Sequence, residues 1–246
     1  MNMKKLAVAI AALSISSATL AANWTLDYRH DYRDGYGENY DRLCLIAGFD
    51  NGIGFYIDSS FHSWGKTGPG KDGYHDGQWG DFGTNATEMS LWWSYKVPDS
   101  HFVVTPGIIT ESTSETTGYK PYVRLQYNTD FGLWTAIRPR YDYWRKDGEG
   151  VDQKNARIDA WLGYKFDNIG ITYNYTHMWA LETDPTIGEK RHMYNGKSSN
   201  YEHNVAFTYK IGQWTPYFEI GNIAARGTAD KSGRQTRFRV GVQYAF

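Results

Sequence analysis

The last nine residues of the chain alternate between apolar and polar side chains up to a terminal aromatic residue. The apolar positions are Phe238, Val240, Val242, Tyr244 and Phe246. Because successive side chains of a strand point to opposite faces, this alternation predicts one strand with an apolar face and a polar face. The pattern recurs in about a dozen segments of the chain, which is typical of a closed membrane barrel with lipid outside and water inside.

The N-terminus has the pattern of a secretory signal peptide over residues 1–22. Two lysines form a positive start, Leu6–Leu20 is a short apolar stretch, and Ala21 and Ala22 supply small residues for cleavage. The apolar stretch is interrupted by serines and a threonine and is shorter than the roughly 20 residues that a membrane-spanning helix needs, which disfavours an anchor helix. We expect residues 23–246 to form a single outer-membrane β-barrel domain.

The composition fits such a barrel. Aromatic residues make up 17% of the chain, with 20 Tyr and 10 Trp, and yet the mean hydropathy is −0.62. A low mean hydropathy together with many Tyr and Trp residues is typical of a barrel with aromatic girdles and a hydrated interior. The net charge of −1 gives no reason to expect a nucleic-acid partner. Cys44 is the single cysteine, so the chain cannot form an internal disulfide.

The alternation predicts an all-β fold, a transmembrane antiparallel β-barrel of twelve strands. The strands are expected at about residues 24–33, 40–49, 53–63, 86–96, 102–110, 120–127, 133–144, 155–166, 169–179, 201–210, 214–220 and 237–246. Short turns such as Asp50-Asn51-Gly52 alternate with longer polar stretches such as 65–84. Outer-membrane barrels have short periplasmic turns and long external loops, so both termini are expected to be periplasmic. Pro106 is awkward in a ladder and predicts a bulge or bend.

The polar face of the predicted strands carries more basic than acidic side chains. The thirteen inward basic residues are Arg29, Arg33, Arg42, Lys96, Lys120, Arg124, Arg138, Arg140, Arg157, Lys165, Lys210, Arg237 and Arg239. The eight inward acidic residues are Asp27, Asp31, Asp58, Glu88, Asp142, Asp159, Glu202 and Glu219. A soluble β-sandwich would need an apolar face at these positions. The surplus of five positive charges therefore predicts a hydrated lumen that leans positive.

A positive lining in a narrow, low-dielectric tube raises the local concentration of anions. The arginine fork also matches a carboxylate with two parallel hydrogen bonds. The candidate pore-lining residues are Arg42, Lys120, Tyr122, Arg124, Arg138, Arg140, Asp142, Arg157, Glu219, Arg237 and Arg239. The inward aromatic residues, placed to stack on sugars, are Tyr122, Trp134, Trp144 and Tyr217. The alternative is that these charges pair across strands and only hold the lumen in shape.

Four segments resemble the oligogalacturonate-specific porin family of Gram-negative outer membranes, which includes the sialic-acid-inducible channel. They are Tyr119–Arg124, Arg138–Trp144, Trp214–Glu219 and Arg237–Val242. The resemblance covers most of the mature chain and is strongest from about Pro106 onward. It implies a monomeric twelve-stranded channel that takes up small acidic oligosaccharides or sugar acids. By position, the residues that match the family's lumen arginines are Arg124, Arg138, Arg140 and Arg239.

The chain departs from the family's pattern in two respects. One is the long glycine-rich segment 63–84, and the other is a set of inward acids, Asp27, Asp31, Glu202 and Glu219. A more general pore for small solutes is therefore an alternative to strict selectivity for acidic sugars. The width of a twelve-stranded barrel, between filled eight-stranded barrels and open porins, predicts a narrow pore in either case.

Other functions are alternatives to a channel. An outer-membrane hydrolase would need a serine nucleophile and a histidine on the outer wall; the candidates are Ser59, Ser60, Ser94 and His177, none in a nucleophile motif. A metal site at His62, His75 and Asp76 is disfavoured by their irregular spacing. A structural or adhesin barrel would have its lumen plugged, with residues 63–84 folded inward. We expect no enzyme activity, no cofactor and no metal.

The expected partners follow from a membrane channel. They are small solutes, with anionic sugars favoured, outer-membrane lipid and lipopolysaccharide, and the barrel-assembly machinery. The C-terminal Phe246 is the expected contact for that machinery. The chain is expected to be a monomer.

Overall fold

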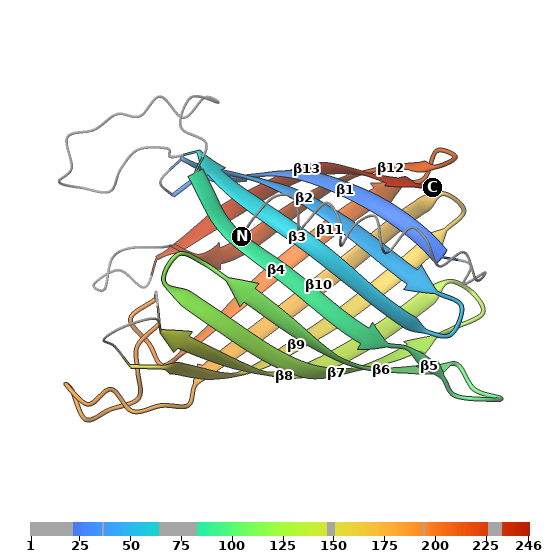
Figure 1. Ribbon diagram of the computed structural model, residues 1–246. Coiled ribbons are helices and arrows are strands. Elements are labelled where there is room, and N and C mark those ends of the chain that lie inside the picture. Colours follow the sequence, from blue (N-terminus) through green and yellow to red (C-terminus); the bar gives the residue numbers. More distant parts are fainter. Residues whose placement is uncertain (1–21, 36, 64–82, 147–150, 194, 226–232) are drawn as a thin grey trace, which may run out of the picture.

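The computed structural model describes residues 22–35, 37–63, 83–146, 151–193, 195–225 and 233–246. They form one antiparallel sheet that closes on itself as a barrel (Figure 1). The strands are β1 (Ala22–Arg33), β2 (Glu38–Phe49), β3 (Ile53–Ser63), β4 (Gly83–Trp93), β5 (Tyr95–Lys96), β6 (Phe102–Ser112), β7 (Thr116–Asn128), β8 (Leu133–Lys146), β9 (Gln153–Phe166), β10 (Ile169–Ala180), β11 (Ser199–Tyr209), β12 (Trp214–Ala224) and β13 (Arg234–Ala245). In these ranges no helix is long and apolar enough to cross a membrane.

β4 and β5 form a single wall strand that is interrupted at Ser94. Both elements pair with β6 in one continuous register, and the break faces the part of β6 that contains Pro106. Proline has no N–H to donate to a ladder, which explains the interruption. The bulge expected at Pro106 is instead a break in the ladder, and the register shift lies between Ser60 and Phe61 of β3. With β4 and β5 counted as one, the barrel has the twelve strands that the alternation predicted.

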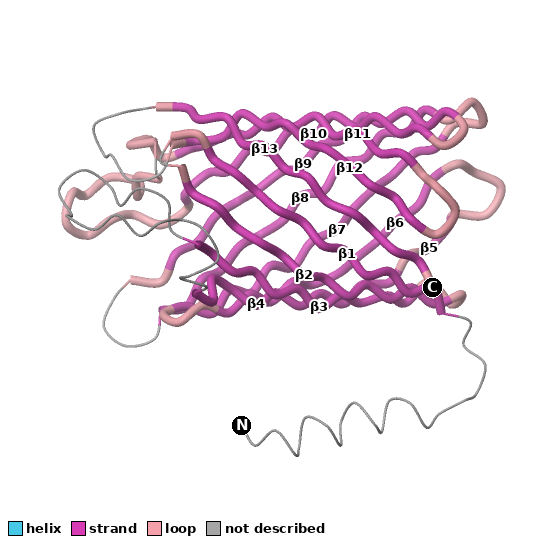
Figure 2. The backbone as a smooth tube through the Cα atoms, turned by 90° about the horizontal axis from the view of Figure 1, so that it is seen from above, coloured by secondary structure: helices cyan, strands magenta, loops and turns pink. Residues whose placement is uncertain are grey.

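The first and last strands close the barrel. β1 pairs with β2 along its whole length and with β13 from Thr25 opposite Ala245 to Arg33 opposite Arg237. The strands are tilted across the barrel (Figures 1 and 2), as closure of a sheet requires. The backbone N–H of Phe246 donates to the carbonyl oxygen of Trp24 at 3.1 Å. The C-terminus and the start of β1 therefore lie at the same end of the barrel.

The connections at that end are tight turns. Five of their residues have positive φ: Gly52 at 86°, Asp99 at 53°, Gly132 at 91°, Asp167 at 48° and Gly212 at 59°. A Cβ at Gly52 would also lie 2.2 Å from the carbonyl oxygen of Ser94. At the other end, residues 34–37 and 113–115 are short connections too. The expected alternation of short turns with longer polar stretches is therefore wrong for these two connections.

The outward face of the barrel is apolar. Leu43, Leu91 and Val240 are 47%, 56% and 52% exposed, respectively. Aromatic side chains lie toward the strand ends, as in the contact of Trp214 with Tyr244, whose ring centroids are 4.6 Å apart. A continuous apolar belt with aromatic rings at its edges fits contact with hydrocarbon and with the two membrane interfaces.

The inward face is polar. The charged residues Asp27, Asp58, Lys120, Asp142 and Asp159 are buried there, and Cys44 is buried as a free thiol. In place of a packed hydrocarbon core, charged side chains line the barrel and bond to one another. The predicted signal peptide before Ala22 and most of the segment 63–84 lie outside the described residues.

Candidate functional site on the inner wall

Three arginines of β8 and β9 share two carboxylates. Arg138 donates from Nε and Nη2 to Oδ2 of Asp159 at 3.1 and 3.0 Å. Arg157 donates from Nε to Oδ1 of the same carboxylate at 2.8 Å. Arg140 holds Asp142 with two hydrogen bonds of 2.6 and 2.8 Å. Because Asp159 is only 1% exposed, these ion pairs are tightly held, and together the five residues carry one positive charge more than negative.

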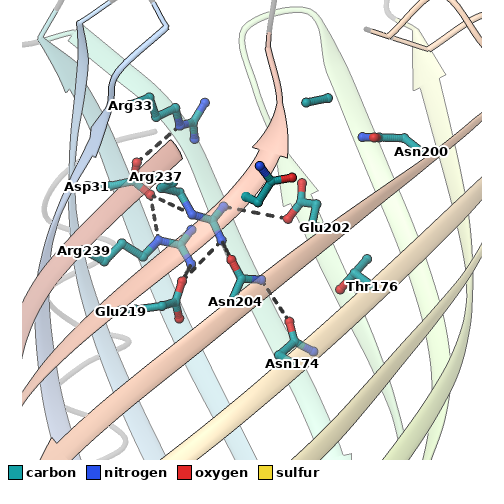
Figure 3. Close-up of polar contacts among 12 residues, drawn as sticks. Asp31, Arg33, Asn174, Thr176, Asn200, Glu202, Asn204, Glu219, Arg237 and Arg239 are labelled. Atoms are coloured by element: carbon teal, nitrogen blue, oxygen red, sulfur yellow. Dashed lines mark hydrogen bonds and ion pairs between the residues drawn. The ribbon is translucent and has the colours of Figure 1, made fainter. Parts of the chain in front are cut away.

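A second network joins β13 to β1, β11 and β12 (Figure 3). Arg239 donates from Nε to Asp31 and from Nη1 to Glu219, in both cases at 2.7 Å. Arg237 donates from Nη2 to Oδ1 of Asn204 at 2.6 Å and to Glu219 at 3.3 Å. Figure 3 shows the two guanidinium groups lying next to each other between these partners. The network therefore ties the closing strands together on the inner wall.

Lys120 of β7 lies between two carboxylates. Its Nζ contacts Glu111 and lies 3.2 Å from Oε2 of Glu88. The ring centroid of Trp144 lies 4.5 Å from the same nitrogen, and Tyr56 donates its hydroxyl to Glu88. One lysine faces two carboxylates here, so this group of side chains on β4, β6 and β7 carries more negative than positive charge.

The predicted site residues all lie on strands with their side chains on the inner face. They are Arg42 on β2, Lys120, Tyr122 and Arg124 on β7, Arg138, Arg140 and Asp142 on β8, Arg157 on β9, Glu219 on β12, and Arg237 and Arg239 on β13. The first two networks above bring most of them together, whereas Arg42 pairs with Asp58. That these residues guide anions stays a prediction.

Sequence reasoning missed two inward carboxylates and two inward indoles. Glu38 lies 3.6 Å from Nη1 of Arg33, and Glu111 contacts Lys120. Both fall just outside the predicted strand ranges, which were drawn too short. They reduce the surplus of basic residues from the predicted five to three. Trp92 and Trp161 were missed too, although they alternate with the outward Leu91 and Leu162 and so carried a signal.

Several inner-wall arginines lie directly opposite one another on neighbouring strands. The pairs are Arg29 with Arg42, Arg33 with Arg237, and Arg140 with Arg157. Like charges in direct cross-strand register destabilise a sheet, by roughly 0.2–1 kcal/mol on the scale of cross-strand pairs. In the last two pairs each arginine has a carboxylate partner.

Arg29 is different from these paired arginines. Its Nε is buried without a hydrogen-bond partner, and no carboxylate of the described residues forms an ion pair with it. A cavity of about 120 Å³ is lined by four arginines and two carboxylates, Arg29, Arg33, Arg42, Arg239, Asp31 and Asp41. We call this cavity the arginine niche. It combines a surplus of positive charge and a guanidinium without an ion-pair partner with open space, and guanidinium groups bind small anions through charge-assisted hydrogen bonds.

The alternative hydrolase site is not assembled. His177 lies on the outward face of β10, where its Nδ1 bonds to the hydroxyl of Tyr175 at 2.8 Å and its ring stacks on Trp179 at 4.2 Å. The hydroxyl of Ser60 donates to a backbone carbonyl, and that of Ser94 bonds to a threonine. In the described part of the chain no three side chains form a metal-binding group, and His75 and Asp76 lie outside that part.

Comparison with known proteins gives consistent matches. The family described as oligogalacturonate-specific porin protein (KdgM) matches residues 15–246. The oligogalacturonate-specific porin KdgM of Dickeya dadantii is 33% identical over 251 residues, which is 100% of both chains. The N-acetylneuraminic acid outer membrane channel protein NanC of Escherichia coli K12 is 25% identical over 252 residues, 99% of each chain. A solved KdgM porin structure superposes with a TM-score of 0.62 at 28% identity, covering 90% of this chain and 99% of that one.

Proposed function

This chain belongs to the oligogalacturonate-specific porin family of outer-membrane channels, and from that premise we propose that it admits small sugar acids and short acidic oligosaccharides by passive diffusion. The two named relatives support this class of solute, because oligogalacturonate and N-acetylneuraminic acid both carry carboxylates. An inner wall with a surplus of arginines would raise the concentration of such anions at the pore.

The arginine niche is the observation that carries the proposal. Arg29 and Arg42 lie in direct register, so their mutual repulsion costs stability, and Arg239 adds a third positive charge to the same cavity. A carboxylate that passes close to these groups would offset the repulsion and accept hydrogen bonds from an unused guanidinium. An arginine row that weakens the sheet and has free donors is better explained by solute passage than by structural support alone.

We propose further that the chain has no enzymatic role and acts as a monomer with both termini in the periplasm. One chain closes the whole barrel, so a lumen does not require a second copy. The named relatives are channels, and the outer-wall His177 contacts Tyr175 and Trp179 instead of a serine or a carboxylate.

Liposome swelling tests the proposal. Vesicles that contain the purified protein would be diluted into isotonic solutions of sodium galacturonate or galactose, which share a ring and differ in the carboxylate. We expect faster entry of galacturonate than of galactose, corrected for vesicles without protein. Equal or slower entry of the acid would contradict the preference for sugar acids, and no entry of either solute would favour a plugged barrel.

A further inference from the structure

Arg124 is held on the inner wall by aromatic rings. Its guanidinium carbon lies 5.8 Å from the ring centroid of Trp134 and 5.1 Å from that of Trp161. In the described ranges no carboxylate forms an ion pair with it, and its Nε is buried without a hydrogen-bond partner. A guanidinium stacked on an indole is pre-oriented and weakly hydrated, while its in-plane N–H groups stay available to a ligand.

Small residues let the aromatic rings lie against the wall. A Cβ at Gly163 would lie 2.2 Å from the ring of Trp134, and a Cβ at Gly107 would lie 2.5 Å from the ring of Tyr122. Each ring therefore covers the glycine on the neighbouring strand. Trp161 lies opposite Ala136, which is also small.

Arg138 completes the same patch of wall. Its guanidinium carbon lies 5.2 Å from the ring centroid of Tyr122 and 5.1 Å from that of Trp161. Unlike Arg124, it is paired with a carboxylate, that of Asp159, through two hydrogen bonds. Arginine and aromatic side chains thus alternate across β7, β8 and β9, and only one of the two guanidinium groups lacks a carboxylate.

We propose that Arg124, Arg138, Tyr122, Trp134 and Trp161 form a saccharide trough that holds one pyranose ring of a sugar acid during passage. This inference rests on the proposed function and names the part of the inner wall where the sugar acid binds during passage. Aromatic faces pack against the C–H face of the sugar, and a few convergent polar groups fix its orientation, as in other sugar-sized sites. Arg124 binds the carboxylate, because it is the arginine of the trough that forms no ion pair with a described residue.

The charged contact and the aromatic contact predict different losses of sugar binding when their residues are replaced. Replacing Arg124 removes the partner of the carboxylate and leaves the aromatic faces in place. Replacing Trp161 removes the aromatic face that both arginines share and affects acidic and neutral sugars alike. The trough therefore predicts that replacing Arg124 weakens binding of acidic sugars alone, whereas replacing Trp161 weakens binding of acidic and neutral sugars. A merely structural role of either residue would not produce this difference.

Single-channel recording with digalacturonate and a neutral disaccharide as probes tests this split. In the unmodified channel we expect digalacturonate to interrupt the ion current for longer than the neutral sugar. Arg124→Gln is expected to shorten the digalacturonate events about tenfold, the scale of one charge-assisted hydrogen bond, and to leave the neutral sugar unchanged. Trp161→Leu is expected to shorten the events of both sugars.

Arg145→Gln is the matched control, because it removes the same charge from the outward face of β8. Its events should match those of the unmodified channel, and its conductance in salt alone shows that an arginine loss by itself does not collapse the barrel. If Arg124→Gln and Trp161→Leu conduct normally and hold digalacturonate as long as the unmodified channel, the trough is wrong while the channel function stands. Unmodified channels that exclude acidic sugars in the swelling assay would contradict both.

Discussion

Arg29 of β1 lies directly opposite Arg42 of β2, with both side chains on the inner face of the barrel. Nε of Arg42 lies 2.6 Å from Oδ2 of Asp58, whereas Arg29 pairs with no carboxylate of the described residues. Two arginines in one cross-strand row thus differ in their ion pairs, because only Arg42 has a carboxylate within ion-pair distance. The predictions below use such differences between neighbouring residues.

Arg29→Gln and Arg42→Gln should have opposite effects on stability. The first removes a like-charge repulsion and should raise the free energy of unfolding by about 0.5 kcal/mol. The second leaves the buried Asp58 without its cation and should lower it by about 1–3 kcal/mol. Urea unfolding followed by tryptophan fluorescence measures both. Equal changes in the two variants would show that Arg29 is a structural residue like Arg42.

Joint replacement of Arg138 and Arg140 by glutamine should move the ion selectivity toward cations. Asp142 loses both hydrogen bonds from Arg140, while Asp159 keeps Arg157, so this cluster of β8 and β9 changes from one net positive to one net negative charge. The zero-current potential in a salt gradient measures the shift. An unchanged potential would place these arginines among residues that only shape the lumen.

Lys120→Met should destabilise the barrel, because it leaves Glu88 and Glu111 as two neighbouring carboxylates without a cation. We expect a loss of about 3 kcal/mol, the lower end for breaking a buried ion pair. Adding Glu111→Gln to this variant removes the repulsion and should restore part of the loss. Urea unfolding of both variants checks this, and a single variant as stable as the unmodified protein would contradict it.

Gly163→Ala should narrow the pore. The new methyl group would lie 2.2 Å from the ring of Trp134, so the ring must swing toward the lumen. We expect lower single-channel conductance with little loss of selectivity. Gly48→Ala is the control, because a Cβ there meets no atom within 4 Å. Equal conductance in the two variants would show that Trp134 does not define the width of the pore.

Most of the strands could be predicted from the sequence, because the alternation of lipid-facing apolar residues with inward polar residues is visible within each segment. The predicted strand 133–144 corresponds to β8, and the predicted strand 155–166 to β9. The errors lie at strand ends, where polar residues replace the outward apolar ones. Arg234 and Gln235 were expected in a loop, and they open β13 because their partners on β12 continue the ladder.

The pairing of charges could not be predicted from the sequence. Asp31 and Arg239 bond although they are 208 positions apart, and their contact depends on the register at which β1 meets β13. The same holds for Arg124, whose aromatic neighbours Trp134 and Trp161 lie on two other strands. Alternation shows which side chains face inward, but only the register shows which of them meet.

The zero-current potential of the unmodified protein in a planar bilayer under a tenfold potassium chloride gradient tests the central claim most directly. The account predicts channels whose potential has the sign of anion preference, because an inner wall of arginines that exceed their carboxylates admits chloride more readily than potassium. Channels that prefer potassium, or a barrel that inserts and passes no current, would contradict it.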